Sequence, residues 1–362
     1  RRSSDLIEEV PEVDAVLGTT SYGDILKAIR EAMEGKHFQE FKDIDYLPEK
    51  LGKRVLTTGG HFGYLKIAEG CDKHCTYCII PKLRGKFRSV PMERLVTQAK
   101  EMAEEGVKEL ILVAQETTVY GTDIYGKKSL HILLKELCKI KGIRWIRVLY
   151  CYPEEIYDEL IQTMKEEKKI CHYLDLPIQH ASDRILKRMG RRTTQAELVE
   201  IVNKLRREIP DIVLRTTLIS GFPGETQEDH EELMSFVDEM EFDRLGVFTY
   251  SPEEDTPAAT MPDQVAEEVK EARRDEIMEL QQEISYDKGT DRIGQELLVM
   301  IEGKVADESA YIGRTYGDAP KVDGYIFVQT GELLMTGDFA KVRVTGALEY
   351  DLIGELADEY TE

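Results

Sequence analysis

The sequence is poor in cysteine and has no long apolar run. Only six of its 362 residues are cysteine, which does not resemble the disulfide framework of a small secreted protein. No stretch of eighteen or more apolar residues occurs, so we expect no membrane span. The opening residues lack both an initiator methionine and the apolar core of a signal peptide. These features predict a cytoplasmic protein, and the start resembles that of a fragment.

Basic residues are scarce relative to acidic ones. The chain has 48 Lys and Arg against 70 Asp and Glu, so its formal net charge is −22. A chain with this charge repels bulk nucleic acid unless a local basic patch overrides the field. The acidity either serves solubility alone, which charge by itself favours, or it matches a basic protein partner.

A chain of 362 residues is too long for one ordinary domain, so we expect two or more, although an α/β barrel could account for most of it. Six short apolar runs have the pattern of buried parallel strands. They span residues 64–68, 108–114, 143–150, 172–177, 212–220 and 244–250. Helix-period segments lie between them, for example 228–240. This alternation predicts an α/β fold, a partial (βα)6 TIM-like barrel whose working face lies at the C-terminal strand ends.

The two ends of the chain have different patterns. Residues 260–288 predict one long, heavily charged helix that closes the barrel. From Gly289 onward, short alternating strands with glycine turns predict a small antiparallel β-barrel or sheet. Near the start, residues 21–34 predict a helix, but residues 1–50 do not make a full domain.

Half of the cysteines crowd into the segment EGCDKHCTYCIIP, as Cys71, Cys75 and Cys78. A zinc site needs four ligands, usually in paired spacings, and His74 between two of the cysteines is poorly placed as the fourth. The alternative is an iron–sulfur cluster with three protein ligands and one open iron, which can chelate a cofactor and deliver an electron into it. Gly70 lets the chain turn sharply into such a loop.

The C-x3-C-x2-C spacing after the first strand, with Tyr77 before the last cysteine, resembles the signature of the radical S-adenosylmethionine (SAM) enzymes. Five longer segments resemble the methylthiotransferase branch of that superfamily. They are GCDKHCTYCIIPKLRG, AQETTVYGTD, LDLPIQHASDRILKRMGR, ISGFPGET and FDRLGVFTYSPEEDTPAA. The tail from Gly289 resembles a TRAM domain, and the resemblance covers nearly the whole chain from about residue 10.

The resemblance implies three parts of the chain and two clusters. Residues 1–57 would be the remnant of an N-terminal methylthiotransferase domain with a linker, residues 58–286 a radical SAM domain and residues 289–362 a TRAM domain. The catalytic cysteines would hold a 4Fe-4S cluster with SAM on its open iron. The family's second 4Fe-4S cluster, the source of sulfur, would belong to an N-terminal domain missing from this chain.

The resemblance also implies site residues at the strand ends. Tyr77 would back the adenine of SAM, and Gln115 and Glu116 would face its methionine portion. Four more would lie near the SAM ribose, adenine or the substrate: Gln179, His180, Ser220 and Gly221. Each has an ordinary alternative, since polar groups at strand ends often cap the next helix. Likewise, four arginines either bind a carboxylate of SAM or substrate or form salt bridges: Arg84, Arg144, Arg147 and Arg215.

The implied reaction adds a methylthio group to the β-carbon of an aspartate in the twelfth small-subunit ribosomal protein. One SAM methylates the sulfur of the second cluster, and another yields the radical that takes a hydrogen from that carbon. The remaining cysteines, Cys138, Cys151 and Cys171, are spread over separate elements. The first suits a buried position, and a role for Cys151 at the working rim stays open.

Two alternatives to this function remain. The closest is a tRNA adenosine methylthiotransferase with the same chemistry, and the other is a non-catalytic iron–sulfur assembly or docking factor. From Gly289 the tail has 15 acidic and 6 basic residues, a net charge of −9. An acidic tail suits a basic ribosomal protein better than tRNA. We therefore expect that protein as partner, with a reductant such as flavodoxin or ferredoxin, and neither nucleic acid nor membrane.

Overall fold

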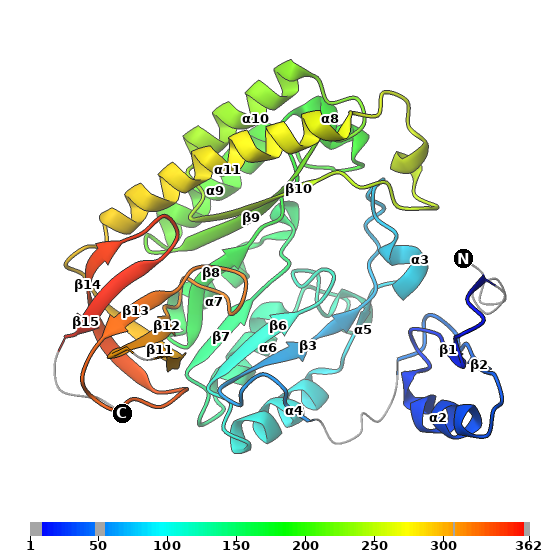
Figure 1. The fold of residues 1–362 in the computed structure, drawn as a ribbon, viewed down its shortest axis with the longest axis horizontal. Helices are drawn as coiled ribbons and strands as arrows, with labels where there is room; N and C mark the ends of the chain where they lie inside the picture. Colours follow the sequence, from blue (N-terminus) through cyan, green and yellow to red (C-terminus); the bar gives the residue numbers. More distant parts are fainter. Residues whose placement is uncertain (1–8, 48–54, 307, 358–362) are drawn as a thin grey trace.

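The six predicted strands form one open parallel sheet (Figure 1). The computed structural model describes residues 9–47, 55–306 and 308–357. The strand order is β10-β9-β8-β7-β6-β3, so each strand pairs with its successor in this list, and every pairing is parallel. The strands are β3 (Phe62–Lys66), β6 (Glu109–Val113), β7 (Trp145–Val148), β8 (Ile170–Asp175), β9 (Val213–Ser220) and β10 (Arg244–Thr249). The predicted partial barrel is therefore confirmed.

Helices connect these strands and bury one face each against the sheet. The longer ones are α4 (Met92–Glu104), α6 (Leu130–Cys138), α7 (Asp158–Glu166), α9 (Gln195–Glu208), α10 (Gln227–Met240) and α11 (Glu267–Thr290). The short ones are α3 (Ile80–Arg84), α5 (Thr122–Tyr125), α8 (Asp183–Arg188) and the 3-10 turns η1 (Tyr22–Asp24), η2 (Pro153–Glu155) and η3 (Pro257–Thr260). In Figure 1, α9, α10 and α11 lie along the β8–β10 end of the sheet.

Local sequence explains where two of these helices begin. Thr194 and Thr226 each accept a hydrogen bond from the backbone N–H three residues on, while the acidic side chain at that position bonds back to the threonine N–H. This capping box satisfies two backbone donors that a helix start leaves without partners. The predicted long helix begins at Glu267 rather than at 260, because a 3-10 turn occupies Pro257–Thr260.

The tail forms a closed five-stranded barrel of β11 (Glu296–Lys304), β12 (Ala310–Arg314), β13 (Ile326–Gln329), β14 (Phe339–Ala347) and β15 (Leu352–Leu356). The sequence pattern predicts strands over 297–304, 311–316, 324–330 and 339–348, which match β11 to β14, and β15 is additional. Its pairing with β13 is parallel, whereas the other pairings are antiparallel. Residues 358–362, part of the predicted TRAM domain, lie outside the described residues.

The C-terminal barrel packs against the inner side of the sheet. Met300 and Phe339 of the barrel share an apolar cluster with Phe62, Ile111 and Trp145. The Trp145 ring meets the Phe339 ring edge-on, with centroids 4.9 Å apart. Helix α11 runs through the predicted boundary at 286 to Thr290 and contacts both the sheet and β14. The barrel therefore closes one end of the concave face of the sheet.

A small N-terminal unit precedes the sheet. It consists of β1 (Ala15–Leu17), α2 (Ile25–Met33) and β2 (Phe38–Glu40), with the two strands parallel. The helix predicted over 21–34 is confirmed. Residues 1–8 and 48–54, which belong to the predicted N-terminal remnant, lie outside the described residues. Throughout the described ranges, no helix combines the length and apolarity needed to cross a membrane.

Candidate active site

The three clustered cysteines lie on a loop held at its base by a two-stranded pair. Strands β4 (Ala68–Glu69) and β5 (Arg88–Ser89) pair antiparallel, and the loop runs between them. Gly70 at the entry has φ +79°, and a Cβ there would lie 2.1 Å from the Lys86 carbonyl oxygen. Only glycine fits this close approach without moving the backbone. The prediction that Gly70 allows the sharp turn is confirmed.

The loop presents three unpaired thiols toward adjoining hollows. Cys71 and Cys78 line the main cavity of the sheet, and Cys75 lines a small hollow beside it. Burial raises the pKa of the Cys71 thiol to about 11 and that of Cys78 above its ordinary value. Metal binding deprotonates such thiols outright. In the described part of the chain, no group of His, Cys, Asp or Glu is placed to hold a single metal ion.

The surroundings of the loop fit a sulfur-containing cluster. The Cys71 Sγ accepts a hydrogen bond from the Lys73 backbone N–H at 3.4 Å, and the Cys75 Sγ lies 3.4 Å from the Tyr152 hydroxyl. Buried N–H groups of Arg191 beside Cys75 have no partner. Thiolate and sulfide sulfurs accept hydrogen bonds from donors of this kind, so the three-cysteine donor set suits an iron–sulfur cluster.

The main cavity has a volume of about 670 Å³ and opens at the C-terminal ends of the strands. Of the predicted cofactor residues, Tyr77, Gln115 and Gln179 line it. Strand and loop residues that complete the wall include Val113, Tyr150, Tyr152, Asp175, Arg215, Thr217 and Phe248. Its floor includes Ala319 and Val322 of the C-terminal barrel. The structure thus brings both domains to one cavity.

Two residues of the cavity wall have an unusual backbone. Tyr150 has φ +59° and Gln179 has φ +73°. The Gln179 backbone is held by hydrogen bonds with Thr217 and Ile219 of β9. Non-glycine residues in the left-handed region cost free energy and concentrate at functional sites. Both residues therefore belong to the candidate site on conformational grounds as well as by position.

Glu116 lies behind the cavity, beside the cysteine loop. It lines a separate hollow with Cys71 and Lys73. Its Oε1 accepts a hydrogen bond from the Thr118 backbone N–H at 2.9 Å, and its buried Oε2 has no partner. Burial raises the pKa of the Glu116 carboxyl to about 7. The predicted contact of Glu116 with SAM stays a prediction.

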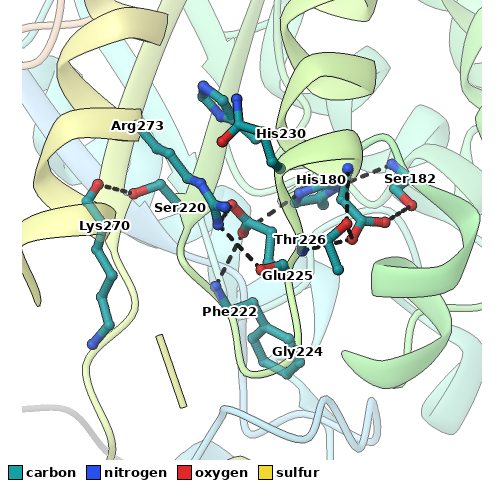
Figure 2. A network of polar contacts seen from close by, with 12 residues as sticks. His180, Ser182, Ser220, Phe222, Gly224, Glu225, Thr226, His230, Lys270 and Arg273 are labelled. Carbon is teal, nitrogen blue, oxygen red and sulfur yellow. Dashed lines mark hydrogen bonds and ion pairs between the residues drawn. The ribbon is translucent and has the colours of Figure 1, made fainter. Parts of the chain in front are cut away.

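Neither Ser220 nor Gly221 lines the main cavity. Ser220 lies at the contact between β9 and α11 (Figure 2). The Ser220 hydroxyl donates to the Lys270 carbonyl oxygen at 2.8 Å. Gly221 has φ +69°, and a Cβ there would overlap the Lys270 side chain. His180 is fully buried, 3.6 Å from Glu225. The predicted SAM contacts of these residues stay predictions, and their observed contacts support the local fold.

The structure separates the four candidate arginines. Arg84 lies 3.9 Å from Glu69 at the surface, and the Arg144 guanidinium stacks on the Phe339 ring. Arg147 is fully buried and donates to Glu109 at 2.8 Å. Only Arg215 of the four lines the main cavity.

Sequence reasoning missed Tyr150, Tyr152, Asp175 and Thr217. Tyr150 was assigned to the end of a strand, whereas β7 ends at Val148 and the chain turns. Asp175 and Thr217 lie on strands where a polar residue interrupts an apolar run, and this interruption is the signal that could have found them.

Comparison with known proteins defines the class first. The chain matches the model of the radical SAM superfamily over residues 65–237 and that of the TRAM domain over residues 293–357. Among solved structures, coproporphyrinogen III oxidase (HemN) from Escherichia coli is 17% identical with a TM-score of 0.47, covering 78% of this chain and 66% of that one. The cysteine loop and the match over residues 65–237 indicate a radical SAM domain.

The particular family follows from closer relatives. The ribosomal protein uS12 methylthiotransferase RimO of Lachnoclostridium phytofermentans is 64% identical over 354 residues, which are 98% of this chain and 80% of that protein. The protein of the same name from Clostridium perfringens is 53% identical over 361 residues, 99% of this chain and 80% of that protein. The chain belongs to the RimO family of methylthiotransferases.

Proposed function

We propose that this chain catalyses the radical chemistry by which an aspartate of ribosomal protein uS12 is methylthiolated on its β-carbon. The observation that carries this proposal is the position of the unpaired thiols of Cys71, Cys75 and Cys78, on one loop at the mouth of the cavity. The RimO relatives support the transferase class and the protein substrate.

The three cysteines would hold a 4Fe-4S cluster whose open iron binds SAM. When bound, this pair would supply the electron and the 5'-deoxyadenosyl radical that takes a hydrogen from an unreactive carbon. The chain's own residues would bind and orient the cofactor and the substrate, and they would exclude water from the site. The buried Oε1 of Gln115 lacks a partner at the cavity wall and suits an N–H donor of the cofactor. Tyr77 and Gln179 offer a ring and a second amide.

Arg215 is the group we assign to the carboxylate of the substrate aspartate. Its Nη1 donates to Asp175 at 2.8 Å and to Thr217 at 3.0 Å, and its Nε lies 3.4 Å from Asp323 of the C-terminal barrel. These contacts fix the guanidinium through Nη1 and Nε and leave Nη2 for a ligand. A planar guanidinium suits a carboxylate. The β-carbon that reacts is bonded directly to that carboxylate.

The source of sulfur lies elsewhere in this proposal. Cys138, Cys151 and Cys171 are buried on separate elements, so the described residues hold no second set of three neighbouring thiols. We assign the sulfur to a second 4Fe-4S cluster outside the described residues. The acidic C-terminal barrel would attract the basic ribosomal protein, and a flavodoxin or ferredoxin would supply the electron.

The first test measures radical formation and its target in the chain as it stands. Protein reconstituted anaerobically with iron and sulfide receives SAM, dithionite and uS12 deuterated at its aspartate β-carbons. We expect 5'-deoxyadenosine carrying deuterium, and loss of this product in Cys75→Ala. The matched control is Cys138→Ala, since Cys138 lies on α6 away from the cavity.

Each other outcome points to a defined alternative. One such outcome is 5'-deoxyadenosine that carries no deuterium, combined with a methylthio group on adenosine when a protein of the relatives' full length is given bulk tRNA. The substrate would then be tRNA rather than uS12. A protein that binds uS12 but never cleaves SAM would be a docking factor and would overturn the proposed activity.

A further inference from the structure

A buried arginine beside the cysteine loop has no role in the function proposed above. Arg191 follows α8 and is only 7% exposed. Its backbone N–H donates to the Leu186 carbonyl oxygen at 2.9 Å, and its Nη2 donates to the Pro177 carbonyl oxygen at 3.0 Å. The first bond fixes the backbone of Arg191, and the second holds its guanidinium through Nη2. Nε and Nη1 take no part in either bond.

The rest of the guanidinium is buried without hydrogen-bond partners. Arg191 Nε and Nη1 are both shielded from solvent, and neither bonds to any other described residue. Buried polar groups, and charged ones above all, are normally satisfied, so such donors need an explanation. The neighbouring acid, Glu154, instead bonds to Thr193 at 2.9 Å and lies 3.5 Å from Lys73. These donors therefore suit acceptor atoms other than those of the described residues.

The cysteine loop lies next to these donors. A hollow of about 60 Å³ is lined by Cys75 and Arg191 together with Tyr152. The Arg191 guanidinium stacks on the Tyr152 ring at 4.3 Å, and the Tyr152 hydroxyl lies 3.4 Å from the Cys75 Sγ. The Tyr152 hydroxyl thus lies at the Cys75 sulfur, and the Arg191 guanidinium lies on the same ring and lines the same hollow.

The segment that bears Arg191 is fastened to the same loop. The Thr76 backbone N–H donates to the Met189 carbonyl oxygen at 2.9 Å, and the Thr76 hydroxyl donates to the Arg188 carbonyl oxygen at 2.8 Å. Gly190 has φ +75°, and a Cβ there would lie 3.0 Å from the His74 carbonyl oxygen. The arginine and the cysteines therefore keep a fixed relative position.

We propose that Arg191, together with Tyr152, is a positioning residue that donates hydrogen bonds to the sulfur atoms of the cluster around Cys75 and raises its reduction potential. The inference rests on the proposed cluster at the three cysteines. Reduction adds one electron from the external reductant, breaks no bond, and makes the cluster more negative. A fixed positive charge and N–H donors stabilise that reduced state more than the oxidised one.

The test is a redox titration of the reconstituted cluster, followed by the electron paramagnetic resonance signal of its reduced form. We expect Arg191→Gln to lower the ratio of reduced to oxidised cluster at least tenfold at a given potential, a shift of about −59 mV for one electron. Tyr152→Phe removes only the hydroxyl and gives a smaller shift in the same direction. Arg144→Gln removes the same charge at the Phe339 contact, away from the loop, and leaves the potential unchanged.

The outcomes separate this inference from the proposed function. If the unchanged protein takes up no 4Fe-4S cluster, the proposed function fails. If the cluster forms and both Arg191→Gln and Tyr152→Phe titrate like the unchanged protein, the inference is overturned. If Arg191→Gln does not retain its cluster, the reduction potentials of Arg191→Lys and Tyr152→Phe are measured instead. A lowered potential in Tyr152→Phe supports the inference. Potentials of Arg191→Lys and Tyr152→Phe that both equal that of the unchanged protein overturn it.

Discussion

At the scale of single residues, Asp229 anchors the loop that follows β9. It accepts hydrogen bonds from the Ser182 hydroxyl at 2.7 Å and the Thr226 backbone N–H at 2.8 Å, and it pairs with Arg184. Burial by itself would raise the pKa of its carboxyl, but the bonds from Arg184, Thr226 and Ser182 outweigh burial and lower the pKa to about 2. Its charged form therefore stabilises the fold.

This lowered pKa predicts a pH-dependent cost for Asp229→Asn. The carboxyl titrates near 3.9 in the unfolded chain, so its contribution is present above about pH 4 and is lost as the pH falls toward 2. We expect the variant to lose about 2 kcal/mol of unfolding free energy at pH 7 and clearly less at pH 3. Urea unfolding at both values measures this, with Asp238→Asn on the exposed side of α10 as control. An equal loss at both values would contradict the assignment.

Arg215 gives a second prediction at this scale. If it binds the substrate carboxylate, Arg215→Lys loses the planar donor pair while keeping the charge beside Asp175. We expect the KM for uS12 to rise about tenfold, equivalent to about 1.4 kcal/mol, with SAM cleavage in the absence of uS12 unchanged. Steady-state kinetics with Arg84→Lys as surface control decide this. A rise confined to the KM for SAM would assign Arg215 to the cofactor instead.

The sequence predicted some residues of the candidate site correctly and missed or misplaced others. The cysteine loop and the glycine that opens it depend on short-range spacing, and both are where the pattern placed them. Gln115 and Gln179 also reach the cavity. Ser220 does not line it, because α11, 50 residues further along the chain, supplies the acceptor for its hydroxyl. No sequence pattern pointed to Arg191, since its position beside Cys75 depends on packing between elements that are distant in sequence.

At the scale of elements, strand patterns predicted the sheet well and the barrel less completely. Most residues of β3, β6, β7, β8 and β9 are buried, whereas β10 is only half-buried. The apolar runs of all six strands are continuous enough to stand out. Strand β15 was missed, and its parallel pairing with β13 joins segments that are not adjacent in the sequence. The contact of the barrel with the sheet was likewise invisible, since it joins residues about 200 positions apart, as Glu109 and Arg314 show.

That contact predicts where the two domains are most sensitive to mutation. Glu109 at the start of β6 is fully buried and accepts hydrogen bonds from Arg147 at 2.8 Å and from Arg314 of β12 at 2.7 Å. Glu109→Ala leaves two buried guanidinium groups with less compensation. We expect a loss of about 3 to 5 kcal/mol of unfolding free energy, measured by urea unfolding followed by circular dichroism.

A surface pair within the barrel provides the matched control. Glu296 accepts a hydrogen bond from Arg343 at 2.8 Å, and both side chains are more than 40% exposed. Exposed ion pairs contribute at most about 1 kcal/mol, so Glu296→Ala should be nearly neutral. If both glutamate variants unfold at the same urea concentration, the buried ion cluster does not stabilise the contact between sheet and barrel.

At the scale of the whole molecule, we propose that the acidic barrel attracts a basic protein substrate. The chain carries −22 overall and −9 from Gly289 onward, while the floor of the cavity comes from the same C-terminal barrel. A basic protein approaching the cavity mouth therefore meets an attractive field. Such a field would accelerate the encounter of the protein with its substrate without changing the chemistry at the cysteines. The rates of substrate encounter and of SAM cleavage should therefore respond differently to salt.

This difference yields the last prediction. Because salt screens charges beyond about 8 Å at 0.15 M, kcat/KM for hydrogen abstraction from uS12 should fall by about tenfold or more between 0.05 and 0.5 M NaCl. SAM cleavage without uS12 should hardly change, because it involves no encounter between macromolecules. The deuterium content of 5'-deoxyadenosine at low uS12 concentration measures the first, and total 5'-deoxyadenosine measures the second. If kcat/KM were insensitive to salt, uS12 would dock through apolar contacts, and the acidity of the barrel would serve solubility alone.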